Sequence, residues 1–182
     1  MKYTPLPSAL YVKNRAKLAA KMAKNSVAVL NSNDIMPTNA DGTMRFRQNN
    51  DLFYLSGIDQ EESILLIAPD CPNTSMREVL FLRETNEHIA IWEGHKYTKE
   101  EAQEASGIEN IQWLANFDQV FNTVMALSER IYLNTNEHLR AGVVVETRDA
   151  RFIKTCKERF PLHEYERLAP IMHELRGAKE PA

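Results

Sequence analysis

The stretch that most constrains the fold is a block of polar and aromatic residues at positions 46–57, with the sequence FRQNNDLFYLSG. Either Asn50 or Asp51 is expected to cap a helix, because its side chain can accept the free backbone N–H groups of a first turn. Gly57 is expected to end that helix, since the residue after a helix often needs a positive φ that glycine adopts without strain. The apolar residues between them predict a short helix inserted beneath a sheet.

The residues that follow this helix predict several strands in succession. Residues 64–67 are apolar at every position, which indicates a strand covered on both faces. Two further strand runs occupy 77–83 and 87–92, and the polar residues 84–86 between them predict a hairpin loop. Three runs without an intervening helix cannot all be parallel neighbours, because parallel strands need a long crossover. We therefore expect a mixed sheet.

The rest of the chain alternates helices with strands. We expect five further helices. The first follows a Ser8 cap and ends at Asn25, and the next two lie over 99–105 after a Thr98 cap and over 117–127 after an Asn116 cap. The last two run from a Thr147 cap to Phe160 and from Pro170 onward. Strands are expected at 26–30, 108–114, 131–133 and 162–168, and no regular element is predicted for 134–146. This order predicts an α/β fold, a three-layer sandwich in which helices flank a mixed β-sheet.

Spacing within the first helix places Tyr11, Leu18 and Met22 on one stripe, with the stem of Arg15 between them. We expect that stripe to face the core. The lysines of the same helix lie mostly elsewhere and are interpreted as a solvated face.

Size and composition favour a single ordinary domain and exclude several functions. The chain has 182 residues and a net charge of −3, which gives no concentrated basic face for nucleic acid. Its two cysteines, Cys71 and Cys156, are too few for a disulfide framework and are expected to be reduced thiols. The amino terminus lacks the apolar core of a signal peptide, and no apolar run approaches the length of a bilayer span. We expect a soluble cytoplasmic protein without a membrane partner.

Four blocks of sequence, in this order and spacing, resemble one known family. They are residues 46–57, residues 79–83 (VLFLR), residues 90–94 (AIWEG), and residues 171–176 (IMHELR) followed by Lys179. Together they are similar to the amino-terminal domain of Xaa-Pro aminopeptidase (aminopeptidase P), within the creatinase/prolidase group. The resemblance implies the same α/β sandwich over residues 1–170. It also implies that residues 171–182 begin a linker helix to a carboxyl-terminal catalytic domain, which this chain would lack.

Members of this family remove an amino-terminal residue that precedes proline, using two divalent metal ions that activate a water molecule. The resemblance places those ions, expected to be manganese, in the catalytic domain, and it assigns no metal ligand or catalytic residue to this chain. The histidine positions are consistent with the absence of a metal site, because the histidines are scattered along the sequence and form no HExxH-type pairing. The chain alone is expected to be inactive. Its expected partners are its own catalytic domain, peptides with proline at the second position, and further copies of itself in a homo-oligomer.

One residue of this chain is a candidate for substrate binding. Trp92 falls where the family's Ile-Trp motif places a tryptophan near the substrate pocket, and a flat aromatic ring suits the apolar ring of proline. On an alternating strand, Trp92 would point away from Ile91. Packing in the core or at the sheet edge is the alternative interpretation of Trp92.

Other polar groups have structural and functional interpretations. The set Arg47, Gln48, Asn49 and Asp51 would either clamp a ligand or satisfy backbone groups around a helix start, and we favour the structural role. Residues 61–62 are two adjacent glutamates, expected on a solvated turn. By resemblance, Arg176 and Lys179 would orient the catalytic domain.

Two other functions are compatible with the same sequence features. One is a non-catalytic peptide- or protein-binding module on the same fold. The other is the N-terminal domain of a prolidase.

Overall fold

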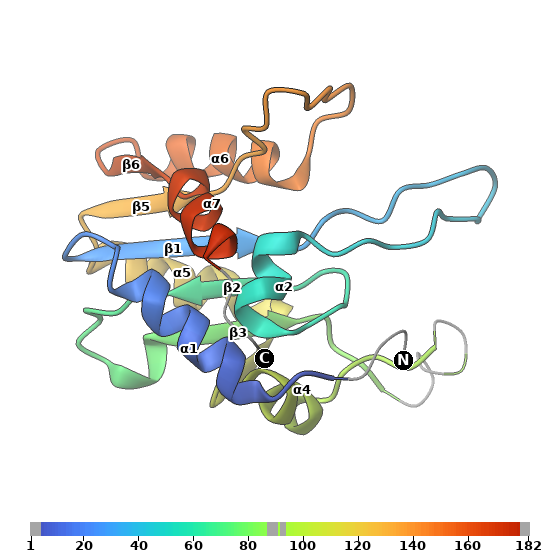
Figure 1. Ribbon diagram of the computed structural model, residues 1–182, viewed down its shortest axis with the longest axis horizontal. Coiled ribbons are helices and arrows are strands. Elements are labelled where there is room, and N and C mark those ends of the chain that lie inside the picture. The colour runs from blue at the N-terminus through green and yellow to red at the C-terminus, as the bar shows by residue number, and fades with distance from the viewer. Residues whose placement is uncertain (1–4, 87–90, 92–93, 179–182) are drawn as a thin grey trace.

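The computed structural model describes residues 5–86, 91 and 94–178, and Figure 1 shows the arrangement of its elements. Six α-helices of the described part are α1 (Ser8–Ala19), α2 (Asn50–Ser56), α4 (Lys99–Ser106), α5 (Phe117–Ala126), α6 (Arg148–Arg159) and α7 (Ala169–Gly177). Its strands are β1 (Ser26–Asn31), β2 (Ile64–Ile67), β3 (Glu78–Leu82), β4 (Asn110–Trp113), β5 (Arg130–Leu133) and β6 (Glu164–Arg167). Two short 3₁₀ turns, η1 (Thr74–Met76) and η2 (Leu114–Asn116), precede β3 and α5.

The six strands form one mixed sheet in the order β4-β3-β2-β1-β5-β6. Strand β2 runs antiparallel to both of its neighbours, whereas β1 with β5, β5 with β6, and β3 with β4 pair in parallel. The predicted mixed sheet is therefore confirmed. The third run of the predicted succession, 87–92, lies outside the described residues except for Ile91.

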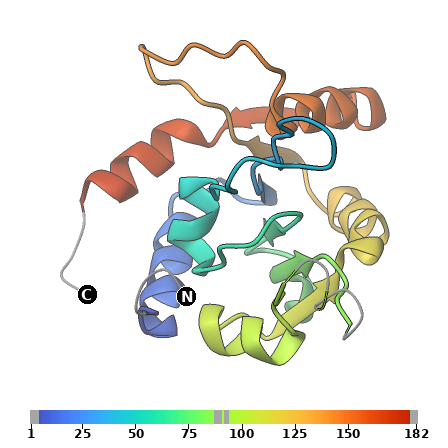
Figure 2. The ribbon, with the colours of Figure 1, turned by 90° about the vertical axis from the view of Figure 1, so that its right-hand side faces the viewer.

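Helices cover both faces of the sheet, as Figure 2 shows from the side. One apolar cluster joins α1, α2, α4 and α7 to one face, and it includes Leu18, Leu52 and Met172. A second cluster joins α5 and α6 to the opposite face, through residues such as Phe121 and Cys156. Alternate residues of the central strands belong to different clusters, because successive strand side chains point to opposite faces. The predicted three-layer sandwich is confirmed.

Helix α2 begins one residue earlier than the sequence indicates. Asn49, rather than Asn50 or Asp51, is the N-cap: its side-chain oxygen accepts hydrogen bonds from the backbone N–H groups of Asp51 (2.9 Å) and Leu52 (3.3 Å). The asparagine just before the first helical turn has the geometry to reach those N–H groups. The end of the helix is as predicted, with Gly57 at a φ of 72°.

The structure also shows which residues cap the other predicted helices. Thr98 and Thr147 cap α4 and α6 through their side chains, as predicted, and Thr98 forms a reciprocal capping box with Glu101. Ser8 does not cap α1 but is its first residue, after Pro7. Asn116 precedes α5 without a side-chain capping bond.

The first helix is shorter than predicted. It ends at Ala19, and residues 20–25 continue as turns in which the N–H groups of Lys21 and Met22 bond the carbonyls of Leu18 and Ala19. These tighter turns satisfy the last carbonyls of the helix and lead into β1.

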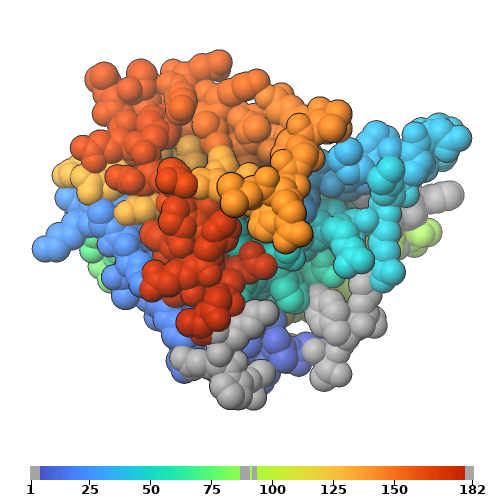
Figure 3. Space-filling model, turned by 45° about the horizontal axis from the view of Figure 1, so that its top comes forward, coloured from blue at the N-terminus to red at the C-terminus, as the bar shows by residue number. Residues whose placement is uncertain are grey.

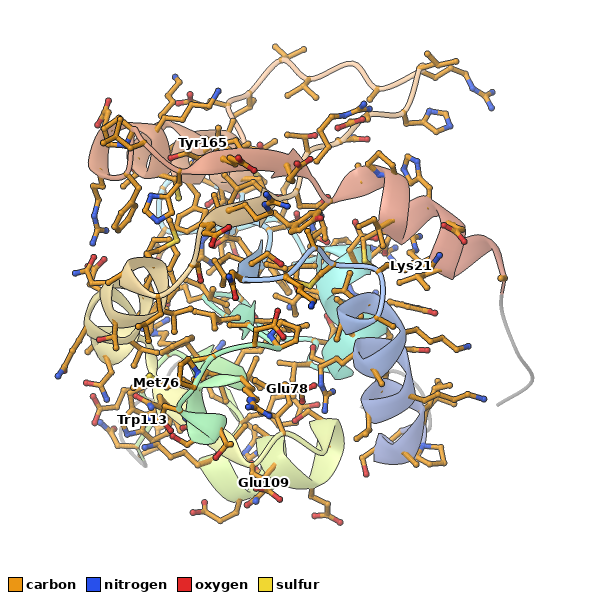
Figure 4. All side chains as sticks on the ribbon, turned by 90° about the vertical axis from the view of Figure 1, so that its left-hand side faces the viewer. Lys21, Met76, Glu78, Glu109, Trp113 and Tyr165 are labelled. Carbon is orange, nitrogen blue, oxygen red and sulfur yellow. The ribbon has the colours of Figure 1, made fainter. Side chains whose placement is uncertain are left out.

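Arg15 is fully buried at the junction of four elements, where the sequence indicated only a buried stem. Its Nε donates to the Glu78 carboxylate at 2.8 Å, and its Nη1 donates to the carbonyls of Leu55 (2.8 Å) and Ser106 (2.9 Å). Figure 4 shows Glu78 at the start of β3, between α1 and α4. Because those carbonyls end α2 and α4, the guanidinium neutralises the negative ends of two helix dipoles.

Candidate functional site

A cleft of about 780 Å³ opens at the carboxyl ends of β1 and β5. These strands are parallel neighbours, and the segments that follow them, 32–49 and 134–147, extend beyond the same end of the sheet (Figure 1). The first segment leads to α2 on one face, and the second leads to α6 on the other. Open α/β sheets commonly bind ligands where neighbouring connections diverge in this way. We call this cavity the switch cleft.

One wall of the switch cleft is the first turn of α2. The Asp51 carboxylate accepts one hydrogen bond from Arg176 Nη1 on α7 (3.0 Å) and another from Asn134 Nδ2 just after β5 (2.9 Å). The three residues come from distant parts of the sequence. They hold α2, α7 and the end of β5 together beside the cavity.

The opposite wall is the first turn of α6. Asn31, the last residue of β1, donates from Nδ2 to Asp149 Oδ1 at 3.0 Å, and Arg148 donates to the Ser32 hydroxyl at 2.6 Å. Burial raises the pKa of the Asp149 carboxyl from its ordinary 3.8 to about 6, against the opposing effects of the Asn31 hydrogen bond and the Arg148 charge. Burial also lowers the pKa of Arg148.

The mouth of the switch cleft carries exposed apolar side chains. They belong to the two projecting segments and comprise Met36, Met44, Val143, Val144 and Val145. In the space-filling view of Figure 3 the second segment, in orange, covers the surface beside α2 and α7. The cavity thus combines a polar floor with an apolar rim.

The structure separates the roles of the polar set at positions 47–51. Gln48 donates from Nε2 to the carbonyls of Ile58 (3.1 Å) and Gln60 (2.8 Å), and Asn49 caps α2. The predicted structural role is confirmed for both residues. Asp51 does not cap the helix, because its carboxylate is bonded to α7 and to Asn134. Arg47 is exposed and lines the switch cleft.

The prediction of a solvated turn at the two adjacent glutamates is wrong for the first of them. Glu61 is 8% exposed and forms an ion pair with Lys96, while Glu62 pairs with Arg83 at 3.2 Å. A buried carboxylate needs such a partner, and the lysine lies 35 residues away in the sequence.

Among the described residues, no group of three or more His, Cys, Asp or Glu side chains is placed to hold a metal ion. His95 pairs with Glu101, and His163 contacts the Met125 carbonyl oxygen. The carboxylates that line the switch cleft are bonded to arginine, lysine or asparagine side chains. The donor set of the described part therefore does not fit a dinuclear metal centre.

The substrate-binding candidate Trp92 lies outside the described residues, as does Lys179. Ile91, which precedes Trp92 in the sequence, belongs to the described residues and is 75% exposed. Arg176, the other basic residue of the closing segment, is engaged within this fold through Asp51.

Sequence reasoning missed the switch cleft because its lining comes from segments that it treated as loops. Asn31 and Asn134 each end or follow a strand, and that placement is the signal that marks them. Two polar residues directly after two parallel strands would have suggested a site at that edge.

No helix in the described part of the chain has the length and apolar character needed to cross a membrane.

Comparison with known proteins gives a consistent result. Xaa-Pro aminopeptidase of Escherichia coli is 23% identical over 173 residues, which cover 94% of this chain and 39% of that protein. Intermediate cleaving peptidase 55 of Saccharomyces cerevisiae is 30% identical over 120 residues, covering 64% of this chain and 21% of that protein. The chain therefore spans well under half the length of these relatives.

Solved structures show the same fold. A putative aminopeptidase P from Bacillus anthracis superposes with a TM-score of 0.81 at 22% identity, covering 94% of this chain and 40% of that one. The family model described as "Aminopeptidase P, N-terminal domain" matches residues 11–132, which is more than half of the chain. On that match, the chain belongs to the aminopeptidase P N-terminal domain family.

Proposed function

We propose that this chain is the non-catalytic N-terminal domain of a metal-dependent Xaa-Pro aminopeptidase, an enzyme that hydrolyses the amino-terminal residue preceding proline. The observation that carries the proposal is the family match over residues 11–132, together with relatives named as Xaa-Pro aminopeptidases. The domain's proposed task is to shape the substrate pocket and to support oligomerisation.

In this proposal the catalytic metal ions, two divalent ions such as manganese, are bound by another domain. The donor set supports that division, because Asp51 is bonded to Arg176 and Asp149 to Asn31 instead of converging on one point. Buried Cys71 and Cys156, both free thiols, support a reducing cytoplasmic location as part of the same proposal.

Trp92 is the proposed contact between this domain and a peptide substrate. The experiment replaces Trp92 with alanine in a longer protein that contains this domain and cleaves Xaa-Pro peptides. The expected result is a higher KM or a lower kcat/KM, with an unchanged unfolding midpoint. The control is Ile91→Ala, at an exposed neighbouring position. Equal kinetics for Trp92→Ala and the unmodified enzyme would remove the assignment.

The proposed oligomer is tested by sedimentation. The longer protein is expected to form dimers or larger assemblies that disappear when residues 1–170 are deleted. Assemblies that persist without this domain would contradict its role in association.

A further inference from the structure

The floor of the switch cleft contains a buried acceptor without a donor. Asn134 is 4% exposed, and its Nδ2 is committed to Asp51 Oδ2 at 2.9 Å. Its Oδ1 is buried and receives no hydrogen bond from the described residues. A buried polar atom left unpaired costs about 1–3 kcal/mol, so this oxygen favours a ligand that brings a donor.

Asp149 provides a second acceptor on the same floor. Only its Oδ1 is bonded to a described side chain, Asn31, and Asp149 forms no ion pair there. Burial raises its pKa, and the nearby charges of Asp51 and Asp34 raise it further. A desolvated carboxylate that lies near two other carboxylates is stabilised in its charged form by a nearby cation.

The arginines around the floor supply only part of that positive charge to Asp149. Arg176 is bonded to Asp51 and Arg151 to Asp34, so two of the three aspartates are neutralised. Arg148 donates to the neutral Ser32 hydroxyl, and its charge lowers the pKa of Asp149 without cancelling the effect of burial. Arg45 and Arg47 line the cavity from exposed positions, where solvent and salt screen their charges.

The rim of the cleft suits the remainder of a basic side chain. Met44, Val143 and Val145 are each more than half exposed and line the cavity above its polar floor. The methylene stem of arginine or lysine buries well against apolar surface while its head stays in a polar environment.

We propose that the switch cleft binds a basic side chain of a polypeptide, with the cationic head donating to Asn134 Oδ1 and Asp149 and the stem lying against the apolar rim. Guanidinium is the better fit, because its planar fork of donors reaches two separate acceptors. The proposed binding does not depend on peptidase activity.

Titration followed by NMR tests the proposal on the 182-residue chain. The probe is N-acetyl-arginine amide, and the matched neutral probe is N-acetyl-citrulline amide. We expect the arginine compound to shift the side-chain amide signals of Asn31 and Asn134 and to bind at least about tenfold more tightly than the citrulline compound. Binding should weaken as salt is added.

Two variants and one control locate the interaction. Asp149→Asn and Asn134→Leu should each weaken binding about tenfold or more, whereas Asp118→Asn should leave it unchanged. Asp118 is exposed on α5, pairs with Arg159, and does not line the cleft. If Asn134→Leu fails to fold, the Asp149→Asn variant and the citrulline comparison still decide the question.

Several outcomes would overturn the proposal. They are equal binding of the charged and neutral probes, preference for N-acetyl-glutamate amide, and unchanged binding by Asp149→Asn. Tighter binding of free arginine than of the blocked amide would also overturn it, because the ligand would then be a free amino acid instead of a polypeptide side chain.

Discussion

Arg176 on α7 donates from Nη1 to Asp51 Oδ1 at 3.0 Å, which ties the last described helix to the first turn of α2 across 125 residues of sequence. Met172 and Leu175 of the same helix are buried in the core cluster that contains α1 and α2. Helix α7 is therefore part of this domain's packing. If Arg176 also orients a catalytic domain, it does so while its guanidinium is bonded to Asp51 of this domain.

Removal of Asp51 is expected to cost more stability than removal of Arg176. Asp51→Ala leaves the buried Asn134 Nδ2 without its acceptor and should cost about 1–3 kcal/mol. Arg176→Ala breaks a partly exposed ion pair and should cost about 0.5–1 kcal/mol. Urea unfolding of both variants measures the difference. A larger loss for Arg176→Ala would contradict this hydrogen-bond assignment.

Arg15 is expected to be the most sensitive charged residue of the domain. Arg15→Met keeps the stem but leaves the helix-end carbonyls of Leu55 and Ser106 without their donor, so we expect a loss of about 3–5 kcal/mol. Glu78→Gln is the matched control, since Glu78 is partly exposed and glutamine retains an acceptor; it should cost about 1 kcal/mol or less. Similar losses in chemical denaturation would show that the carbonyl contacts contribute little.

Substitutions at Asn49 and Asn50 test which residue caps helix α2. Asn49→Ala should lower the free energy of unfolding by about 0.5–2 kcal/mol, because two backbone N–H groups lose their acceptor. Asn50→Ala, at the exposed first residue of α2, should change it by less than about 0.5 kcal/mol. If Asn50→Ala is the more damaging variant, the cap lies one residue later than described.

Asp149 is expected to destabilise the fold at neutral pH. Its pKa is about 6 when folded, against an ordinary 3.8, so between these values the folded chain holds a proton that the unfolded chain releases. Stability from this group is therefore lost as the pH rises through that window. Asp149→Asn should add about 1–3 kcal/mol at pH 8 and almost nothing at pH 3.5.

The control for this prediction is Asp118→Asn, whose carboxylate is largely exposed. Thermal unfolding of both variants across the pH range gives the comparison. A gain for Asp149→Asn that is independent of pH, or a loss at pH 8, would show that the carboxyl is not desolvated.

The sequence predicts the parts of this fold that depend on neighbouring residues. Thr98, Thr147 and Gly57 mark helix ends because their capping groups lie within four residues in the chain. The mixed sheet follows from closely spaced strand runs. Such features need no knowledge of distant contacts.

The parts that could not be predicted depend on contacts between distant residues. The partners of Arg15 lie 40 to 91 residues away, and Glu61 meets Lys96 across 35 residues. The switch cleft is assembled from two connections that separate strands place side by side. Composition alone gives no reason to join residues 31, 134 and 149.

We propose that this domain is a scaffold and that the peptide hydrolysis typical of the family is performed by another domain. The most direct measurement incubates the purified 182-residue chain with manganese and a peptide carrying proline at the second position, and follows release of the first amino acid. We predict no release above a protein-free control. Release that scales with the amount of chain, and stops when the metal is chelated, would contradict the claim.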